Sequence, residues 1–297
     1  MKYPELSIDI FRQGLEIFQK TDSDKLFLFV NNNDEKIFWL NSKLCSEDVV
    51  IIAPGKIDDS EINSEKKNSV LNVWSGNQSR FSRVKYAVLK GCHTGIISES
   101  SRITCVLGPG GRSGLDTIIV HDLETSWSED FPFDPGSLTG RPDLSVIMAV
   151  LDIALDIGAL GREGKSVGTI FIIGDSDTVL SQSHQAVFNP FEGYPPSDCS
   201  ITRQEVVESI KELAKIDGAF VITGSGIVKS GGRHLESQSQ DKVQEKGMGS
   251  RHRSASAMTV STGAVAVVVS ESTGRVTVFE KGRLLATLEP VISRRLE

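Results

Sequence analysis

The chain has 297 residues, of which 39% are hydrophobic and 24% charged, a composition typical of a folded protein long enough for two domains. Its formal net charge of −7 argues against a general nucleic-acid-binding surface, and no apolar run reaches the roughly 20 residues of a membrane span. The four cysteines are scattered without paired spacing, which excludes a recognisable zinc motif or disulfide framework. We therefore expect a cytoplasmic protein with neither a membrane nor a nucleic-acid partner.

Residues 1–125 alternate apolar helices and strands, which predicts an N-terminal α/β domain with a mainly parallel sheet. Ser7 is expected to cap the first helix, and residues 31–35 to form a turn. Gly108-Pro109-Gly110-Gly111 follows a strand as a phosphate loop would, but it lacks the lysine of a P-loop, which favours a plain turn. The expected helices are 7–20 and 81–91, and the expected strands are 25–30, 48–53, 95–97, 103–107 and 117–120.

Residues 126–142 are rich in acids, proline and glycine and are expected to link this domain to a second one spanning 143–297. In the second domain we expect a mixed central sheet flanked by helices. Thr202 and Glu205 have the spacing of a capping box, and residues 224–233 resemble a glycine-rich hairpin loop. The expected helices are 143–160, 202–216 and 254–260. The expected strands are 167–173, 219–223, 264–269 and a last hairpin over 274–282.

The stretch Arg251-His252-Arg253 is the strongest chemical signal, with hydroxyls at Ser250 and Ser254 and a small-residue helix expected to follow. Arginine presents a planar fork of donors that matches phosphate oxygens, and neighbouring guanidinium charges bias a histidine towards its neutral form. A helix start adds free backbone N–H groups. The stretch is either an anion-binding cradle or a basic surface loop.

Carboxylates stand at the ends of two apolar strands, as Asp217 and as Glu271 beside Ser270. Strand ends are where ligands collect in α/β sheets, and hard carboxylate oxygens suit Mg²⁺ or Mn²⁺ bridged to substrate phosphates. Each carboxylate also has a plainer interpretation, since Asp-Gly is a common turn pair and Glu271 could be an exposed hairpin residue. From these residues alone we infer a phosphate-bearing ligand with a metal plausible beside it.

At these residues the sequence resembles the diadenylate cyclase domain family, also called the DisA-N family. Asp217-Gly218-Ala219, followed about thirty residues later by Arg251-His252-Arg253, is similar to the paired signature of the family. Residues 161–171, 189–194 and 269–274 resemble its flanking stretches. The resemblance covers roughly residues 143–290. The whole layout is similar to archaeal-type cyclases, whose N-terminal domain resembles the α/β domain of pyruvate kinase.

This resemblance implies that two ATP molecules are condensed into cyclic di-AMP (c-di-AMP) and two pyrophosphates by self-associated chains whose cyclase domains face each other. It implies that Asp217 orients or deprotonates the attacking 3′-hydroxyl, directly or through Mn²⁺ or Mg²⁺, and that Glu271 helps to hold the metal. Arg251, His252 and Arg253 would be catalytic residues that grip the phosphates. The remaining nucleotide contacts would be Gly218, Ala219, Leu235, Ser250, Ser254 and Ser270.

Two other functions remain open at this point. The chain could be a non-catalytic sensor that binds ATP or c-di-AMP and signals through its N-terminal domain. Asp217 favours an enzyme over a sensor, because a carboxylate beside the α-phosphate repels a bound nucleotide unless a metal lies between them. A protein-interaction module with incidental motifs would bind no nucleotide at all.

Overall fold

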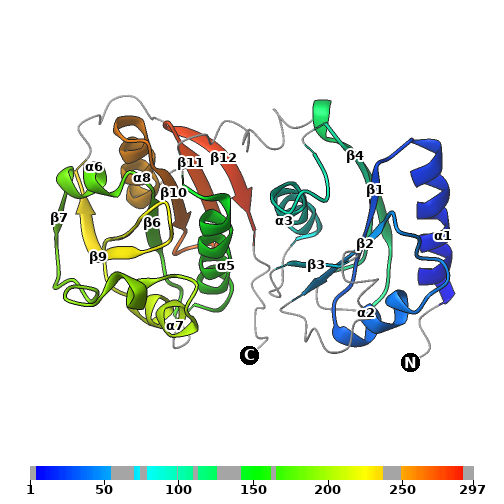
Figure 1. The fold of residues 1–297 in the computed structure, drawn as a ribbon, viewed down its shortest axis with the longest axis horizontal. Helices are drawn as coiled ribbons and strands as arrows, with labels where there is room; N and C mark the ends of the chain where they lie inside the picture. The colour runs from blue at the N-terminus through cyan, green and yellow to red at the C-terminus, as the bar shows by residue number, and fades with distance from the viewer. Residues whose placement is uncertain are drawn as a thin grey trace. The chain divides into compact units, whose positions relative to one another are not determined.

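The computed structural model describes residues 5–54, 70–73, 79–98, 100–109, 113–125, 142–161, 165–236 and 249–289. The chain divides into two compact units, Met1–Phe131 and Pro132–Glu297, each with its own sheet and core (Figure 1). The expected linker, except Pro142, lies outside the described residues, as do Gly110 and Gly111. Within the described ranges, every helix is too short or too polar to cross a bilayer.

The N-terminal unit is built on a five-stranded sheet in the order β3-β2-β1-β4-β5. Neighbouring strands run parallel except the pair β4–β5, which is antiparallel. Continuous apolar runs such as Val49–Pro54 suit the centre of such a sheet because both of its faces are covered. The strands are β1 (Lys25–Phe29), β2 (Val49–Pro54), β3 (Val70–Val73), β4 (Arg102–Leu107) and β5 (Thr117–Asp122).

Three helices cover this sheet: α1 (Glu5–Lys20) and α2 (Asn33–Leu40) on one face, and α3 (Arg80–His93) on the other (Figure 1). Phe11 of α1 and Trp39 of α2 meet over β1 with ring centroids 4.5 Å apart and no exposed surface. Their burial joins both helices to the sheet through apolar contact.

Three N-terminal predictions are wrong in detail. Ser7 does not cap α1, because it lies inside the helix and its Oγ accepts the backbone N–H of Leu115 at 3.0 Å. Residues 31–35 enter helix α2, whose N-cap is Asn32, rather than forming only a turn. Residues 95–97 are not a strand, since the N–H groups of Ile96 and Ile97 donate to Gly91 at the end of α3.

The C-terminal unit contains a seven-stranded mixed sheet in the order β12-β11-β10-β6-β8-β9-β7. Strands β6 and β8 run parallel, and the other neighbours are antiparallel. The strands are β6 (Thr169–Ile173), β7 (Ser183–Gln185), β8 (Ala219–Ile222), β9 (Val228–Leu235), β10 (Val265–Val269), β11 (Val276–Glu280) and β12 (Arg283–Leu288).

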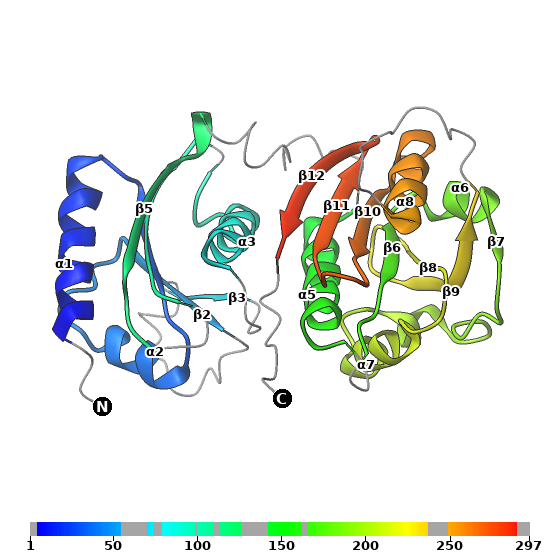
Figure 2. The ribbon, with the colours of Figure 1, turned by 180° about the vertical axis from the view of Figure 1, so that it is seen from behind.

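Helix α8 (Ser250–Ser261) and the short α6 (Ser176–Ser181) pack on one face of this sheet, where Ala255 and Met258 enter its core (Figure 2). The long apolar α5 (Leu144–Leu160) packs against β10 and β11, and α7 (Gln204–Leu213) packs against α5. Side chains alternate between the two faces of each strand, so the central strands need apolar residues at every position. This explains their uninterrupted valine and isoleucine runs.

Several C-terminal predictions also need correction. The expected capping box is absent, because α7 starts at Gln204 after Arg203 and the Thr202 hydroxyl instead contacts Ser200 at 2.8 Å. The glycine-rich segment is a hairpin arm rather than a loop, since β9 pairs with β8. Two short elements were not predicted, namely α6 over residues 176–181 and β7 over residues 183–185. Helix α8 begins at Ser250 instead of residue 254, which puts Arg251-His252-Arg253 in its first turn.

Sheet register gathers the functional segments at one edge. Gly168 immediately precedes β6 and Gly218 immediately precedes β8, and these strands are parallel. Strand β10 runs opposite to β6, with Val269 beside Thr169, so Ser270 and Glu271 emerge at this same edge. The site therefore lies at the amino ends of the parallel pair, whereas ligands in open parallel sheets usually lie at the carboxyl ends.

Candidate functional site

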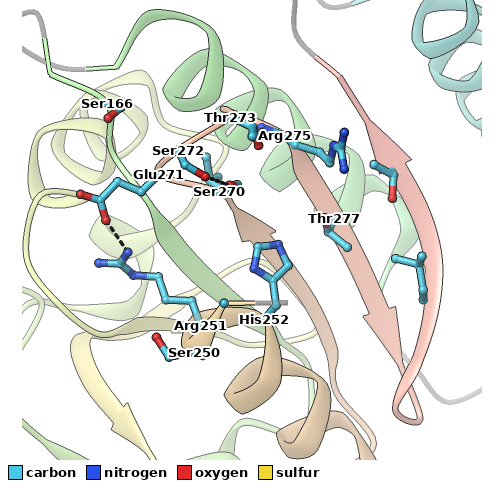
Figure 3. A pocket seen from close by; sticks show the side chains of 14 residues that line it. Ser166, Ser250, Arg251, His252, Ser270, Glu271, Ser272, Thr273, Arg275 and Thr277 are labelled. Atoms are coloured by element: carbon cyan, nitrogen blue, oxygen red, sulfur yellow. Dashed lines mark hydrogen bonds and ion pairs between the residues drawn. The ribbon is translucent and has the colours of Figure 1, made fainter. Parts of the chain in front are cut away.

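Arg251 connects the two carboxylates singled out by the sequence. Its Nη1 donates to Glu271 Oε2 at 2.7 Å, and its Nη2 lies 3.5 Å from Asp217 Oδ1, the outer limit of a hydrogen bond. The Glu271 contact is drawn as a dashed line in Figure 3. Three segments far apart in the chain, namely the start of α8, the end of β10 and the turn before β8, thus meet at one guanidinium.

Gly168 makes this meeting possible. A Cβ atom at this position would lie 2.8 Å from Glu271 Cβ and 2.9 Å from Arg251 Nη1, closer than real side chains approach. Only glycine therefore leaves room for the Arg251–Glu271 pair beside β6. Gly168 lies in a stretch that resembles the family but was not among the predicted site residues, although a glycine just before a buried strand is a known sign of close approach.

A cavity of about 920 Å³ opens beside this pair (Figure 3). Its walls come from the first turn of α8, the turn after β10, and strands β11 and β12. Two arginines, one histidine and many hydroxyls line it, with few large apolar groups. The lining residues are Ser166, Gly249, Ser250, Arg251, His252, Val269, Ser270, Glu271, Ser272, Thr273, Arg275, Thr277, Leu284 and Thr287.

A second, smaller cavity of about 140 Å³ lies on the Asp217 side of Arg251. Apolar side chains provide part of its wall, and both Ser250 and Arg251 line the two cavities in common. Arg251 therefore contributes to the walls of both cavities. The smaller pocket is lined by Ile170, Ala186, Asp217, Gly218, Arg233, His234, Leu235, Ser250, Arg251 and Ser254.

His252 is held near its neutral form. Burial lowers the pKa of the imidazole below its usual 6.5, and the positive charge of Arg275 lowers it further. The ring packs edge-on against Phe279, with centroids 6.1 Å apart. Arg251 and Arg253 were the arginines expected to favour the neutral form, whereas burial has the larger effect and the relevant arginine is Arg275, just before β11.

Asp217 stands at the surface, with 93% of its side chain exposed, and its Oδ1 accepts the N–H of Gly218 at 3.1 Å. Gly218 has φ +118°, and a Cβ there would lie 2.6 Å from the backbone of Gly232. The Asp-Gly pair is therefore a tight turn as well as a cavity wall. The turn interpretation of this pair is therefore confirmed, and the catalytic role of Asp217 stays a prediction.

Two residues of the predicted set stand apart from the cavities. Ala219 is fully buried in β8 and belongs to the apolar core. Arg253 is exposed on α8, one residue beyond His252, and lines neither of the two described cavities. Helical rotation explains this, since consecutive residues point about 100° apart around the axis. Nucleotide contacts by Ala219 and Arg253 stay predictions.

Arg233 and His234 also line the small cavity, although neither was among the predicted site residues. The guanidinium of Arg233 donates to Ser183 Oγ at 2.8 Å and to the carbonyl of Leu180 at 2.9 Å. Burial lowers the pKa of Arg233. Arg233 thus ties β9 to the edge segment formed by α6 and β7, which makes it a structural residue of the pocket wall.

The carboxylates offer a limited metal site. Among the described residues, no group of three or more His, Cys, Asp or Glu side chains is arranged to hold a metal ion. Asp217 and Glu271 both face Arg251, and Asp217 is the more exposed of the two. Mg²⁺ commonly uses one or two carboxylates together with substrate phosphates, so this donor set fits a metal that arrives with a nucleotide.

Arginines, hydroxyls and a helix start surround the large cavity beside a mixed sheet, and these are donor types that phosphate groups use in nucleotide-binding proteins. Residues 156–284 match a family model described as DisA bacterial checkpoint controller nucleotide-binding. A diadenylate cyclase of Methanocaldococcus jannaschii is 31% identical over 294 residues, covering 96% of this chain and 94% of the relative.

A diadenylate cyclase of Haloferax volcanii is 31% identical over 269 residues, covering 91% of this chain and 94% of that relative. A solved structure of a DacA double mutant from Staphylococcus aureus has a TM-score of 0.34 and 22% identity, over 47% of this chain and 84% of that one. The chain belongs to the diadenylate cyclase family.

Proposed function

We propose that this protein condenses two ATP molecules into c-di-AMP and two pyrophosphates. Membership of the diadenylate cyclase family supports this reaction. The observation that carries it at the site is the bridge from Arg251 to Asp217 and Glu271, because it joins a phosphate-binding cation to the carboxylate needed at the attacking hydroxyl.

The two cavities suit the two ends of ATP. The small pocket offers Ile170, Ala186 and Leu235 as apolar walls for the adenosine part. The large polar cavity, with Arg251 and His252, suits the triphosphate. Arg251 lies between them, where the α-phosphate joins the nucleoside to the remaining phosphates.

In each half-reaction the 3′-oxygen of one ATP attacks the α-phosphorus of the other. A new O–P bond forms, the bond to the β-bridging oxygen breaks, and its electron pair leaves with pyrophosphate. The 3′-hydroxyl proton passes to the Asp217 carboxylate and then to solvent. Two such steps close the ring, and Arg251 stabilises the charge on the α-phosphate as the bond is exchanged.

Asp217 would hold Mn²⁺ or Mg²⁺ together with phosphate oxygens of ATP. Glu271, the other carboxylate that contacts Arg251, would help to hold the ion. The ion supplies positive charge that offsets the repulsion between the phosphates and the attacking oxygen. Glu271 also positions Arg251 through their 2.7 Å contact.

Ring closure requires two nucleotides, so we propose that two chains face each other through this edge of the sheet. The 93% exposure of Asp217 supports this arrangement, because a reacting carboxylate at the surface is accessible to a nucleotide carried by a second chain. Specific activity should therefore fall on dilution, and sedimentation velocity across the same concentrations should show dissociation. Constant activity of a species that sediments as a monomer would contradict the facing arrangement.

The test of the reaction is incubation with ATP and Mn²⁺ or Mg²⁺, followed by mass spectrometry of the nucleotides. Asp217→Asn should abolish c-di-AMP while ATP binding remains measurable, and Asp198→Asn, another exposed carboxylate of this unit, should retain activity. ATP binding by the wild type without any product would support a sensor instead. Absence of both product and binding would reject a nucleotide function.

A further inference from the structure

Arg275 is fixed in the backbone of the site independently of its side chain. Its carbonyl accepts the N–H of Ser270 at 2.9 Å, and its own N–H donates to Thr273 Oγ1 at 3.3 Å. These bonds close the turn between β10 and β11, directly after Glu271. The turn that carries Glu271, the partner of Arg251, therefore also places the Arg275 side chain at the large cavity.

The Arg275 side chain lines the large cavity with Thr277 and Thr287. Figure 3 shows His252 between Arg251 and Arg275, so that three basic groups follow one another along the cavity. Arg251 contacts Asp217 and Glu271 at one end of this row, and Arg275 lies at the other end, beside Glu289 after β12. An extended anion reaching from Arg251 past His252 would arrive at Arg275.

Glu289, just after β12, forms an ion pair with the Arg275 guanidinium. Nη2 of Arg275 lies 2.6 Å from Glu289 Oε1, and both side chains are about half exposed, at 50% and 53%. An ion pair this exposed contributes little to stability, because water already solvates both charges. A phosphate group can therefore replace the carboxylate on the guanidinium fork without unfolding the strands.

The positive charge of Arg275 acts on His252, which lines the same cavity. The charge of Arg275 is felt at His252, whose pKa it lowers in addition to the larger effect of burial. His252 therefore stays available as a neutral hydrogen-bonding group between two permanent cations, Arg251 and Arg275. Such a row matches a ligand whose negative charge is spread along a chain of phosphates.

We propose that Arg275 binds the β- and γ-phosphates of ATP and retains them as the pyrophosphate leaving group, and that Glu289 competes with them for its guanidinium. This inference rests on the proposed cyclase reaction and extends it to the end of the triphosphate. Negative charge accumulates on pyrophosphate as the bond from the α-phosphorus breaks, so a cation at that end stabilises the departing group. The Glu289 carboxylate would in turn promote pyrophosphate release by forming its ion pair with Arg275 again.

The test compares Arg275→Gln with Glu289→Gln in the full-length protein. We expect Arg275→Gln to raise the KM for ATP and the inhibition constant for pyrophosphate by about tenfold, as expected for loss of charge-assisted hydrogen bonds. Glu289→Gln should lower both constants several-fold, because it removes the competing carboxylate. Binding of AMP, which lacks the distal phosphates, should change in neither variant.

Opposite shifts in the two variants are the diagnostic result. Shifts in the same direction would mean that Arg275 and Glu289 form only a structural ion pair, and unchanged constants would equally overturn the proposal. If Arg275→Gln fails to fold by circular dichroism, Arg275→Lys keeps the charge but not the fork and should show a smaller increase in both constants. Two measurements separate this site from the proposed reaction. Absence of c-di-AMP from the wild type in mass spectrometry rejects the reaction, whereas a pyrophosphate affinity that does not depend on Arg275 in calorimetric titration rejects this site.

Discussion

Arg251 and Glu271 are joined across 2.7 Å although twenty positions separate them in the chain, one at the start of α8 and the other just after β10. Their side chains are 32% and 58% exposed, so solvent screens the attraction. The contact therefore matters chiefly for orientation. It fixes the arginine that lines both the smaller and the larger cavity.

Glu271→Gln should lower the rate of c-di-AMP formation by about tenfold or more, because Arg251 loses the charged acceptor that orients it. The free energy of unfolding should change by less than about 1 kcal/mol, as for other exposed pairs. Product formation by mass spectrometry and urea unfolding measure the two effects. Asp198→Asn, which breaks the exposed Arg203–Asp198 pair, is the matched control and should leave the rate unchanged. Equal rates for wild type and Glu271→Gln would remove Glu271 from the site.

Gly168→Ala should displace the Arg251–Glu271 pair, since the added Cβ would lie 2.8 Å from Glu271 Cβ. We expect the activity to fall about tenfold or more while the sheet remains folded, because a small misplacement of a positioning group is costly to rate. Gly263→Ala is the control, as its Cβ would meet nothing nearer than 3.7 Å. A fully active Gly168→Ala variant would show that the pair tolerates displacement.

Gly218→Ala should destabilise the protein by on the order of 2 kcal/mol, because φ is +118° and the new Cβ would approach Gly232 within 2.6 Å. The measurement is the midpoint of urea unfolding. Gly224→Ala, whose Cβ would lie 3.4 Å from its nearest neighbour, should cost much less. Equal midpoints for the two variants would mean that the turn relaxes without strain.

His252 should make stability depend on pH between its ordinary and its lowered pKa. Above pH 6.5 the imidazole is neutral in both the folded and the unfolded chain, so it contributes no difference. As the pH falls below 6.5, the unfolded chain binds the proton first, and stability is lost until the folded imidazole also titrates. His252→Gln should therefore lose less unfolding free energy than the wild type between pH 7.5 and 5. Parallel pH profiles from urea unfolding would contradict this.

Local pattern sufficed for most of the helices and strands. The all-round apolar run of residues 144–160 and the valine run of residues 265–269 appear as α5 and β10. Failures occurred where tertiary contacts overrode a local signal. Ser7 bonds to Leu115 across the unit instead of capping its own helix, and β9 is a strand despite its glycines because β8 and β7 pair with both its sides. The likeness of the N-terminal domain to pyruvate kinase stays a prediction.

The signature residues, Asp217 and Arg251-His252-Arg253, could be read from the chain and pointed to the family, because motif identity and spacing do not depend on the fold. Which of these residues come together depended on the packed fold. Arg251 bridges two carboxylates while Arg253 is exposed on α8, and Gly168 and Arg275 join the site although neither belongs to the paired signature. The physical reason is that strand register and helix rotation, set by core packing over long sequence separations, choose the side chains that share a cavity.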